Sequence, residues 1–263
     1  DIRLDRSLFP IRTQFRYRNN MKISGFTFCH NVLEGGYPVA ESISAVRPFV
    51  DEIIAVDIES TDGTYSILDK LCDKVLTSSW DGRDTTPRAF LKHTECKGDI
   101  IIFFEADEVY DDNLLSEVLW AIERGYFHLG VWRLQIECNF QKVRQYPIPV
   151  HRIFFRGQGS YHIHPTNLPD FPVHILPPNA GYLWDCSNCF RDNWFQRKQN
   201  QSEIWGEPRS LMVAEHFTEP VEISKIEEEN RLNDACWLWT YTPLNIPSIL
   251  LPLVGKSRYE VSI

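Results

Sequence analysis

The most constraining feature of the sequence is a run of five consecutive apolar residues, Ile100 to Phe104, that ends in the acidic cluster Glu-Ala-Asp-Glu at 105–108. A strand that is apolar on every side chain is buried on both faces, which is typical of a parallel sheet covered by other layers. Like charges crowded at its end repel one another. The cluster therefore requires a positive partner or a bound cation.

The residues around this run alternate regularly between strand and helix patterns. Apolar and β-branched runs predict strands at 22–32, 51–64, 74–80 and 99–109. Helical spacing and glycine or polar boundaries predict helices at 34–49, 65–74, 86–98 and 113–125. This alternation indicates an α/β fold with a doubly wound, mostly parallel central sheet flanked by helices. Ligands bind such sheets at the carboxyl ends of the strands, where the acidic segments 57–62 and 105–108 lie.

Composition narrows the class of protein. The chain has 263 residues, a net charge of -9 and 43% hydrophobic residues, which favours one large globular domain over a binder of nucleic-acid backbones. We expect no spanning helix, because the late apolar stretch at 246–255 is short and broken by prolines. The first residues lack the apolar core of a signal peptide, and the seven cysteines include one CxxC pair, Cys186 and Cys189. A cytoplasmic protein with reduced thiols and no structural zinc is expected.

The acidic cluster suggests how a phosphate-bearing ligand is held. The sequence has neither GxGxxG nor GxxxxGK[ST], so no glycine-rich loop is available to cradle phosphates. A Mg²⁺ or Mn²⁺ ion held by carboxylates can bridge a diphosphate instead. On an extended backbone Glu105 and Asp107 face the same side and Glu108 points away. The alternative is a solvated turn that caps the following helix.

Three segments together carry a family resemblance: ISGFTFCHN from residue 23, VDEIIAVDIESTDGT from 50 and GDIIIFFEADE from 98. They resemble the nucleotide-sugar half of family 2 glycosyltransferases with the GT-A fold. That family commonly has a VDDGSTDGT-like turn, which residues 56–64 match except at Ile58 and Glu59. The resemblance covers 22–125 and implies one GT-A-like domain over 1–263, in which 126–263 form an irregular acceptor-side half.

The resemblance implies roles for the carboxylates. Asp57 would lie beside the base or ribose of a nucleotide diphosphate sugar, Glu105 would meet the ribose or the metal, and Asp107 would bind the metal on the diphosphate. Glu59 would replace, with a longer arm, the acidic contact that Ile58 lacks. For Asp57 and Glu59 the alternative is simple loop capping. The implied activity is metal-dependent transfer of a sugar from a nucleotide diphosphate sugar, with inversion.

Cations and a further metal ligand are expected elsewhere. Arg83, with Arg88 nearby, lies where similar enzymes place a basic residue toward the nucleotide. Asp185 stands near the position of a metal-binding His in related transferases, which makes it a third candidate ligand. Arg191 and Lys198 are two helical turns apart and so share a helix face that can offset diphosphate charge. Solvated surface positions are the alternative for all of these cations.

The second half is less regular. Strands are predicted at 130–140 and 150–157 and are expected to pair, followed by long ordered loops over 160–184 and a strand end that leads into a helix over 183–205. An inverting transferase needs a base for the acceptor proton. The candidates are His162, His164, Asp170 and His174, among which we name His164 as the catalytic residue. The aromatic residues at 237–241 either stack on an acceptor sugar or pack on the body.

Two other functions remain compatible with this pattern. A nucleotidyltransferase or sugar-nucleotide pyrophosphorylase needs a glycine-rich loop with a basic residue, and the segment after the first strand supplies only Gly35 and Gly36. A non-catalytic nucleotide or glycan binder on the same scaffold is the second. The acceptor could be a glycan, a lipid-linked sugar, a protein or a nucleic acid.

Overall fold

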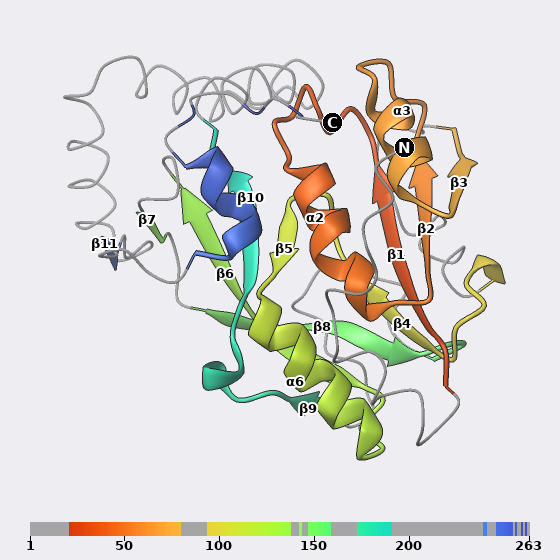
Figure 1. The fold of residues 1–263 in the computed structure, drawn as a ribbon, viewed down its shortest axis with the longest axis vertical. Coiled ribbons are helices and arrows are strands. Elements are labelled where there is room, and N and C mark those ends of the chain that lie inside the picture. Colours follow the sequence, from red (N-terminus) through yellow and green to blue (C-terminus); the bar gives the residue numbers. More distant parts are fainter. Residues whose placement is uncertain are drawn as a thin grey trace, which may run out of the picture.

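The computed structural model describes residues 21–79, 94–137, 142–143, 147–158, 173–190, 239–240, 246–254, 256, 259 and 261. Its centre is one large mixed sheet with the strand order β11-β7-β6-β8-β4-β1-β2-β3 (Figure 1). Two further strands, β5 and β10, join it away from this path, and β9 pairs with β6. The sheet brings residues from both halves of the chain into one layer.

The first half of the chain forms the parallel part of the sheet. Strand β1 (Ile23–Cys29) lies in the middle and pairs in parallel with β2 (Glu52–Asp57) on one side and β4 (Ile100–Phe103) on the other. Strand β3 (Lys74–Thr77) extends the sheet in parallel beyond β2. The predicted parallel arrangement of these four strands is confirmed, and their carboxyl ends meet at one edge.

The second half adds antiparallel strands. Strand β8 (Ile148–Phe155) pairs antiparallel with β4 and with β6 (Leu129–Glu137), which confirms the predicted pairing of 130–140 with 150–157. Two short strands, β7 (Lys142–Val143) and β9 (His174–Ile175), pair with β6. A third, β11 (Trp239–Thr240), pairs with β7. Strand β8 therefore joins the two halves of the chain within the sheet.

The predicted strand at 99–109 is wrong in extent. Strand β4 stops at Phe103, and residues 105–108 form a turn in which the Glu108 amide donates to the Glu105 carbonyl at 3.0 Å. A separate strand, β5 (Glu108–Tyr110), follows and pairs antiparallel with β10 (Leu183–Asn188). The acidic residues end the buried ladder because charged groups are costly to bury without partners. The predicted strand at 51–64 likewise ends earlier, at Asp57.

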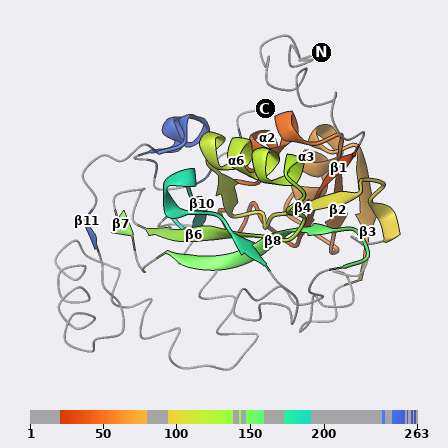
Figure 2. The same cartoon turned by 90° about the horizontal axis from the view of Figure 1, so that it is seen from below.

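Within the described residues, helices α2, α3 and α6 cover one face of the sheet (Figure 2). Helix α2 (Val39–Val46) begins after Pro38, and α3 (Thr64–Leu71) follows Gly63, whose φ of 96° suits a glycine. Helix α6 (Asp112–Glu123) is capped by Asp111, which accepts from the Asn113 amide. Short 3₁₀ turns lie at η2 (Arg47–Phe49), η3 (Pro178–Ala180) and η4 (Ser248–Leu253). Most of the predicted helix at 86–98 lies outside the described residues.

The core has a layer on each side of β4. Ile100 and Ile102 pack with the helices, whereas Ile101 and Phe103 pack on the opposite face with residues that include Phe26. All of β4 is buried, as its apolar sequence predicts. Among the described residues, the structure contains no helix with the length and apolar character needed to cross a membrane.

Candidate active site at the carboxyl ends of the strands

The loops that follow β1 and β2 are bonded to each other. Asn31 has a left-handed backbone, with φ 45°, and its side-chain Oδ1 accepts the Thr61 amide at 2.8 Å. The Asn31 amide in turn donates to Ser60 Oγ at 3.0 Å. Asn tolerates this backbone conformation better than most residues because its short amide can bond locally. The two loops therefore hold each other in place above the strand ends.

Asp62 ties the same loops to helix α3. Its Oδ1 accepts the Thr64 amide at 2.9 Å and the Thr64 hydroxyl at 2.6 Å, and its Oδ2 accepts the Glu34 amide at 2.8 Å. The Thr64 hydroxyl oxygen also accepts the Val32 amide at 3.1 Å. The STDGT segment is thus a rigid support for the residue at the end of β2, which is Asp57.

Asp57 is almost completely buried, with 3% of its surface exposed. Its Oδ2 accepts the Ser60 amide at 3.2 Å, so the loop-capping role is real. Its Oδ1 is also buried, yet within the described part of the chain it has no hydrogen-bond partner. A buried carboxylate oxygen without a donor is costly, and a ligand N–H or O–H would satisfy it. Glu59, two residues on, is exposed with φ 48°.

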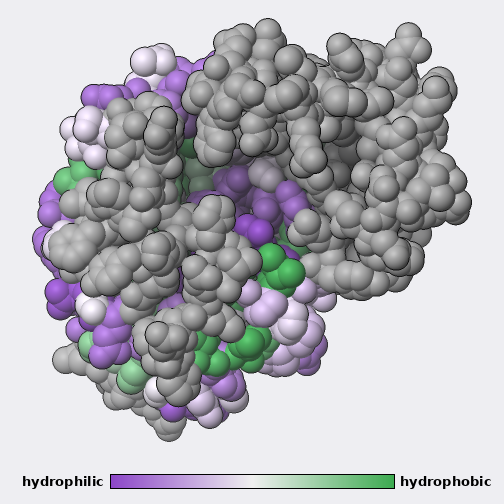
Figure 3. Space-filling model, turned by 180° about the vertical axis from the view of Figure 1, so that it is seen from behind, coloured by the Kyte–Doolittle hydropathy of each residue, from purple (hydrophilic) through white to green (hydrophobic). Residues whose placement is uncertain are grey.

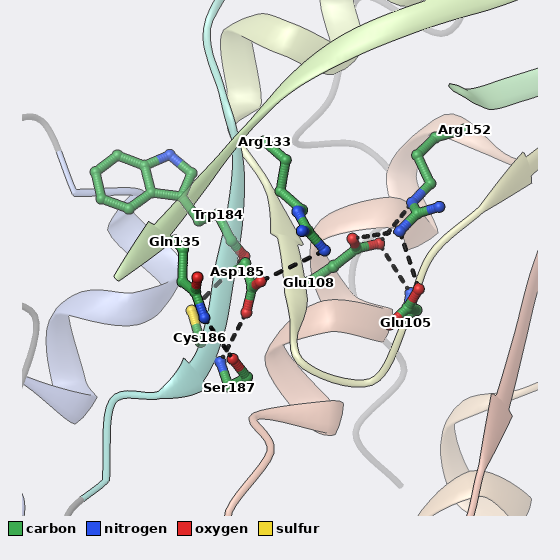
Figure 4. Close-up of polar contacts among 9 residues, drawn as sticks. All are labelled: Glu105, Glu108, Arg133, Gln135, Arg152, Trp184, Asp185, Cys186 and Ser187. Carbon is green, nitrogen blue, oxygen red and sulfur yellow. Dashed lines mark hydrogen bonds and ion pairs between the residues drawn. The ribbon is translucent and has the colours of Figure 1, made fainter. Parts of the chain in front are cut away.

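The acidic turn after β4 surrounds a buried arginine from β8 (Figure 4). Arg152 is 2% exposed, and it donates through Nε to Glu108 Oε2 at 2.9 Å and through Nη2 to Glu108 Oε1 at 2.6 Å. The same Nη2 donates to Glu105 Oε1 at 2.9 Å. Arg152 is the positive partner that the crowded carboxylates require.

The side chains of Glu105 and Glu108 do not lie as an extended strand end predicts. Because residues 105–107 form a turn rather than extended backbone, Glu108 does not point away from Glu105; both carboxylates face Arg152. The Glu105 amide also donates to Glu108 Oε2 at 3.2 Å. Arg152 itself was missed. A signal was available, since VHRIFF places one charged residue among apolar neighbours in a predicted strand.

The buried charges perturb one another. Desolvation and the neighbouring Glu108 carboxylate raise the pKa of Glu105 to about 7, although Arg152 opposes the shift. Burial alone would lower the pKa of Arg152, but the carboxylates of Glu108 and Glu105 raise it. Burial also raises the pKa of Tyr110, whose hydroxyl donates to the Phe103 carbonyl at 3.0 Å. The ion-paired group therefore joins the acidic turn at Glu105 and Glu108 to Arg152 on strand β8.

Asp107 lies in the turn between β4 and β5. Its backbone carbonyl accepts the Cys186 amide from β10 at 2.7 Å, and its side chain is partly exposed. Burial raises the pKa of the Cys29 thiol at the end of β1, and the charges of Asp57 and Asp107 raise it further. Asp107 is therefore close to the ends of both β1 and β10.

Asp185 enters the same region from β10. Its Oδ1 accepts the Ser187 amide at 3.0 Å, and its Oδ2 lies 3.6 Å from Arg133 Nη1 on β6 (Figure 4). The Asp185 charge contributes to the raised pKa of Glu105. Within the described ranges, no three His, Cys, Asp or Glu side chains form a group able to hold a metal ion by themselves. Metal binding by Asp107 and Asp185 therefore stays a prediction.

Most of the remaining predicted site residues lie outside the described part of the chain, and one lies away from the carboxylates. Arg83, His164, Arg191 and Lys198 lie outside the described residues, as do Arg88, His162 and Asp170. His174 is on β9, stacked on Tyr126 with ring centroids 4.2 Å apart. Because β9 pairs with the start of β6 at Leu129, whereas Asp185 pairs with Gln135, His174 is about 20 Å along the strand from the carboxylates.

Seen from the side opposite to Figure 1, hydrophilic described residues gather near the middle of the visible surface (Figure 3). The parallel strands β1 to β4, the turns at their carboxyl ends and the antiparallel strands that follow define a GT-A type α/β protein.

Comparison with known proteins identifies the family. Residues 29–181 match the family described as Glycosyl transferase family 2, which is more than half of the chain. The chain belongs to this family, and the sequence-based assignment of family and fold is confirmed.

Two curated relatives are uncharacterized glycosyltransferases. The one from Rickettsia felis is 35% identical over 129 residues, covering 48% of this chain and 44% of the relative. The one from Rickettsia conorii has the same identity and coverage. The chain therefore spans less than half the length of these relatives.

Solved structures show a partial likeness. Mannosyl-3-phosphoglycerate synthase from Rubrobacter xylanophilus has a TM-score of 0.39 and 18% identity, covering 51% of this chain and 47% of that one. S. aureus TarS 1-349 in complex with UDP has a TM-score of 0.37 and 20% identity, covering 44% and 36%.

Proposed function

We propose that the protein is a metal-dependent, inverting glycosyltransferase that moves a sugar from a nucleotide diphosphate sugar to an acceptor. Residues 22–125 form the donor half and 126–263 the acceptor half of one domain. The observation that carries the proposal is the buried Asp57 Oδ1, which has no partner among the described residues and lies at the carboxyl end of β2. Family membership supports the reaction class.

The described carboxylates suit a nucleotide and its phosphates. Asp57 accepts a hydrogen bond from the base or ribose, and Glu105, anchored by Arg152, accepts one from a ribose hydroxyl. Asp107 would hold the metal ion, with Asp185 as a second ligand. Carboxylate oxygens fit Mg²⁺ or Mn²⁺, which commonly use one or two protein carboxylates together with substrate phosphates and water. When bound, such an ion stabilises negative charge on the leaving diphosphate.

Other residues complete the proposed reaction. Arg83 and Glu59 contact the nucleotide, and Arg191 and Lys198 contact the diphosphate. The acceptor hydroxyl attacks the anomeric carbon, the bond from that carbon to the diphosphate oxygen breaks, and His164 takes the hydroxyl proton. These roles follow from the family resemblance and the chemistry of the side chains.

The test is thermal stabilisation by nucleotide sugars. We expect one or two UDP-, GDP- or dTDP-sugars to raise the melting temperature only when Mn²⁺ is present, because Asp107 would bind the phosphates through the metal. Asp107→Ala should abolish the shift, whereas Asp69→Ala on the exposed face of α3 should leave it unchanged. Stabilisation that is equal with and without metal contradicts the metal role.

A non-catalytic binder is the second candidate. One observation favours it: Arg152 already compensates Glu105 and Glu108, so part of the acidic cluster is stable without any metal. Mn²⁺-dependent release of nucleotide diphosphate from the stabilising sugar nucleotide, without acceptor, separates the two. A transferase hydrolyses the donor slowly, whereas a binder releases none.

A further inference from the structure

Two arginines lie beside the carboxylates, and they differ in how their donors are used. Arg152 makes hydrogen bonds to both Glu108 and Glu105, and its side chain is 2% exposed. The Arg133 side chain makes no hydrogen bond in the described part of the chain, and its one ion-pair contact is the 3.6 Å approach to Asp185 Oδ2. Its side chain is 20% exposed, so the guanidinium is largely shielded from water but not enclosed.

The neighbours of Arg133 are held firmly. Trp132 Nε1 donates to the Leu176 carbonyl at 2.8 Å, and Gln135 Nε2 reaches Ser187 Oγ at 3.4 Å. Ser187 in turn donates its amide to Asp185. Strand β6 thus presents Arg133 from a rigid frame, beside Gln135 on the same face of the strand. A flexible surface arginine does not have this setting.

A structural ion pair does not account for this arrangement well. A single contact at 3.6 Å without a hydrogen bond contributes little to stability. A guanidinium has five N–H donors in a planar fork, and leaving them without acceptors in a shielded position is unfavourable. That fork matches the paired oxygens of a phosphate or carboxylate.

The position of Arg133 indicates which substrate carries the anion. It belongs to β6, on the opposite side of β4 and β8 from the donor-half strands β1 to β3. It is close enough to Glu105 for its charge to act on that carboxylate, and Figure 4 shows it between Asp185 and the Glu105–Glu108 pair. An anion at Arg133 would therefore lie next to the proposed donor site but on its acceptor side.

We propose that Arg133 binds a phosphate or carboxylate group of the acceptor, so that the acceptor substrate is anionic. This rests on the proposed transferase function. The negative carboxylates nearby oppose an anion, so the interaction requires the direct fork contact and is strengthened by a divalent cation at Asp107.

The test uses inorganic phosphate as the probe. Phosphate is titrated calorimetrically into the free protein and into protein saturated with UDP or GDP and Mg²⁺. We expect binding in both states, about tenfold or more weaker in Arg133→Gln, and weakened less in Arg133→Lys, which keeps the charge without the fork. The matched control is Arg156→Gln, an exposed arginine after β8, which should bind phosphate as the parent protein does.

The outcomes separate the sources of the anion. If Arg133→Gln weakens nucleotide diphosphate binding by the same factor, or if saturating nucleotide displaces phosphate, Arg133 serves the donor and the proposal is overturned. Absence of phosphate binding also overturns the proposal. So does phosphate binding of equal affinity by Arg133→Gln, provided that the circular dichroism spectrum of this variant shows that it is folded. Asp107→Ala distinguishes the two proposals, because it should abolish metal-dependent nucleotide binding and leave phosphate binding to the free protein intact.

Discussion

Arg152 shows how one side chain can make an acidic cluster compatible with a buried strand. Two carboxylates and one guanidinium share three hydrogen bonds at the end of β4. Such a group is costly to bury, but losing one member is costlier because a charge is then left without compensation. The net effect is that the position of Glu105, a proposed ligand contact, depends on a residue of another strand.

Replacing Arg152 should destabilise the protein strongly. We expect Arg152→Met to lower the free energy of unfolding by about 3–5 kcal/mol, because the buried Glu108 carboxylate and the partly buried Glu105 beside it would lose their counter-ion. Urea unfolding followed by circular dichroism measures this. Arg156→Met, at an exposed position, should change stability by less than about 0.5 kcal/mol.

A compensated variant makes this prediction sharper. Adding Glu105→Gln and Glu108→Gln to Arg152→Met removes the uncompensated charges, so much of the stability should return. No recovery in the triple variant would mean that packing, rather than charge, accounts for the loss.

The sequence predicted the site only in part at this scale. Asp57, Glu105 and Asp107 are adjacent to strand ends in the sequence, so strand periodicity alone placed them at one edge. The ion pair of Glu108 with Arg152 joins residues 44 apart, and Asp185 and Arg133 are likewise brought together by pairing of β10 with β6. Sequence spacing contains no information on such partners, and it assigned an extended backbone where a turn forms.

At the scale of elements, the start of β4 depends on a glycine. A Cβ at Gly98 would lie 2.5 Å from the Ser24 amide nitrogen and 2.6 Å from Ser24 Oγ. The Gly98 amide donates to Ser24 Oγ at 2.8 Å, and Ser24 Oγ donates to Glu52 Oε1 at 2.6 Å. These bonds join the segments that begin β1, β2 and β4, so the glycine is required by close approach of two backbones.

Gly98→Ala should therefore separate these strand starts. We expect a loss of about 1–3 kcal/mol in the free energy of unfolding, because the methyl group meets backbone atoms that cannot move independently. Thermal and urea unfolding check it. The exposed neighbour gives the control, since Lys97→Ala should cost less than about 0.5 kcal/mol.

The order of elements was predictable, whereas their ends were not. Apolar runs identified β1, β2, β3, β4, β6 and β8, and helical spacing identified α2, α3 and α6. The division of 99–109 into β4 and β5 was missed because Val109 and Tyr110 are apolar and continue the pattern. β5 is buried through its pairing with β10, which no local pattern indicates.

At the scale of the whole molecule, residues near the C-terminus pack against the end of strand β10. Leu250, Leu253 and Tyr259 are buried in one cluster with Cys186, Cys189 and Phe190. The Tyr259 hydroxyl donates to Glu41 Oε2 at 2.7 Å, across 218 residues of sequence. The described part of the apolar stretch 246–255 thus packs on the body of the protein through Leu250 and Leu253, and the Tyr259 hydroxyl contacts helix α2.

Removing the Tyr259 hydroxyl should give a pH-dependent loss of stability. Burial raises the pKa of Glu41, and the hydrogen bond from Tyr259 opposes that rise. In Tyr259→Phe the pKa of Glu41 rises further, so the folded protein holds this proton more tightly than the unfolded chain does. The loss, about 1–2 kcal/mol at pH 7, should shrink as the pH is lowered and Glu41 is protonated in both proteins.

Unfolding curves for both proteins between pH 4 and 7 measure this difference, because this range starts near the ordinary pKa of a glutamate carboxyl and extends above it. A loss of stability that is constant across the range would mean that the hydroxyl does not act through the Glu41 charge.

The insertion of β8 between β4 and β6 has a consequence for how the chain acquires its structure. During synthesis, the segment up to residue 125 emerges with one edge of β4 lacking its neighbour and with two acidic side chains lacking their counter-ion. Residues 148–155 supply both when they are synthesised, because β8 pairs with the free edge of β4 and carries Arg152, the missing cation. The half of the chain up to residue 125 is therefore expected to mature late, as part of a cooperative unit with the half that follows it.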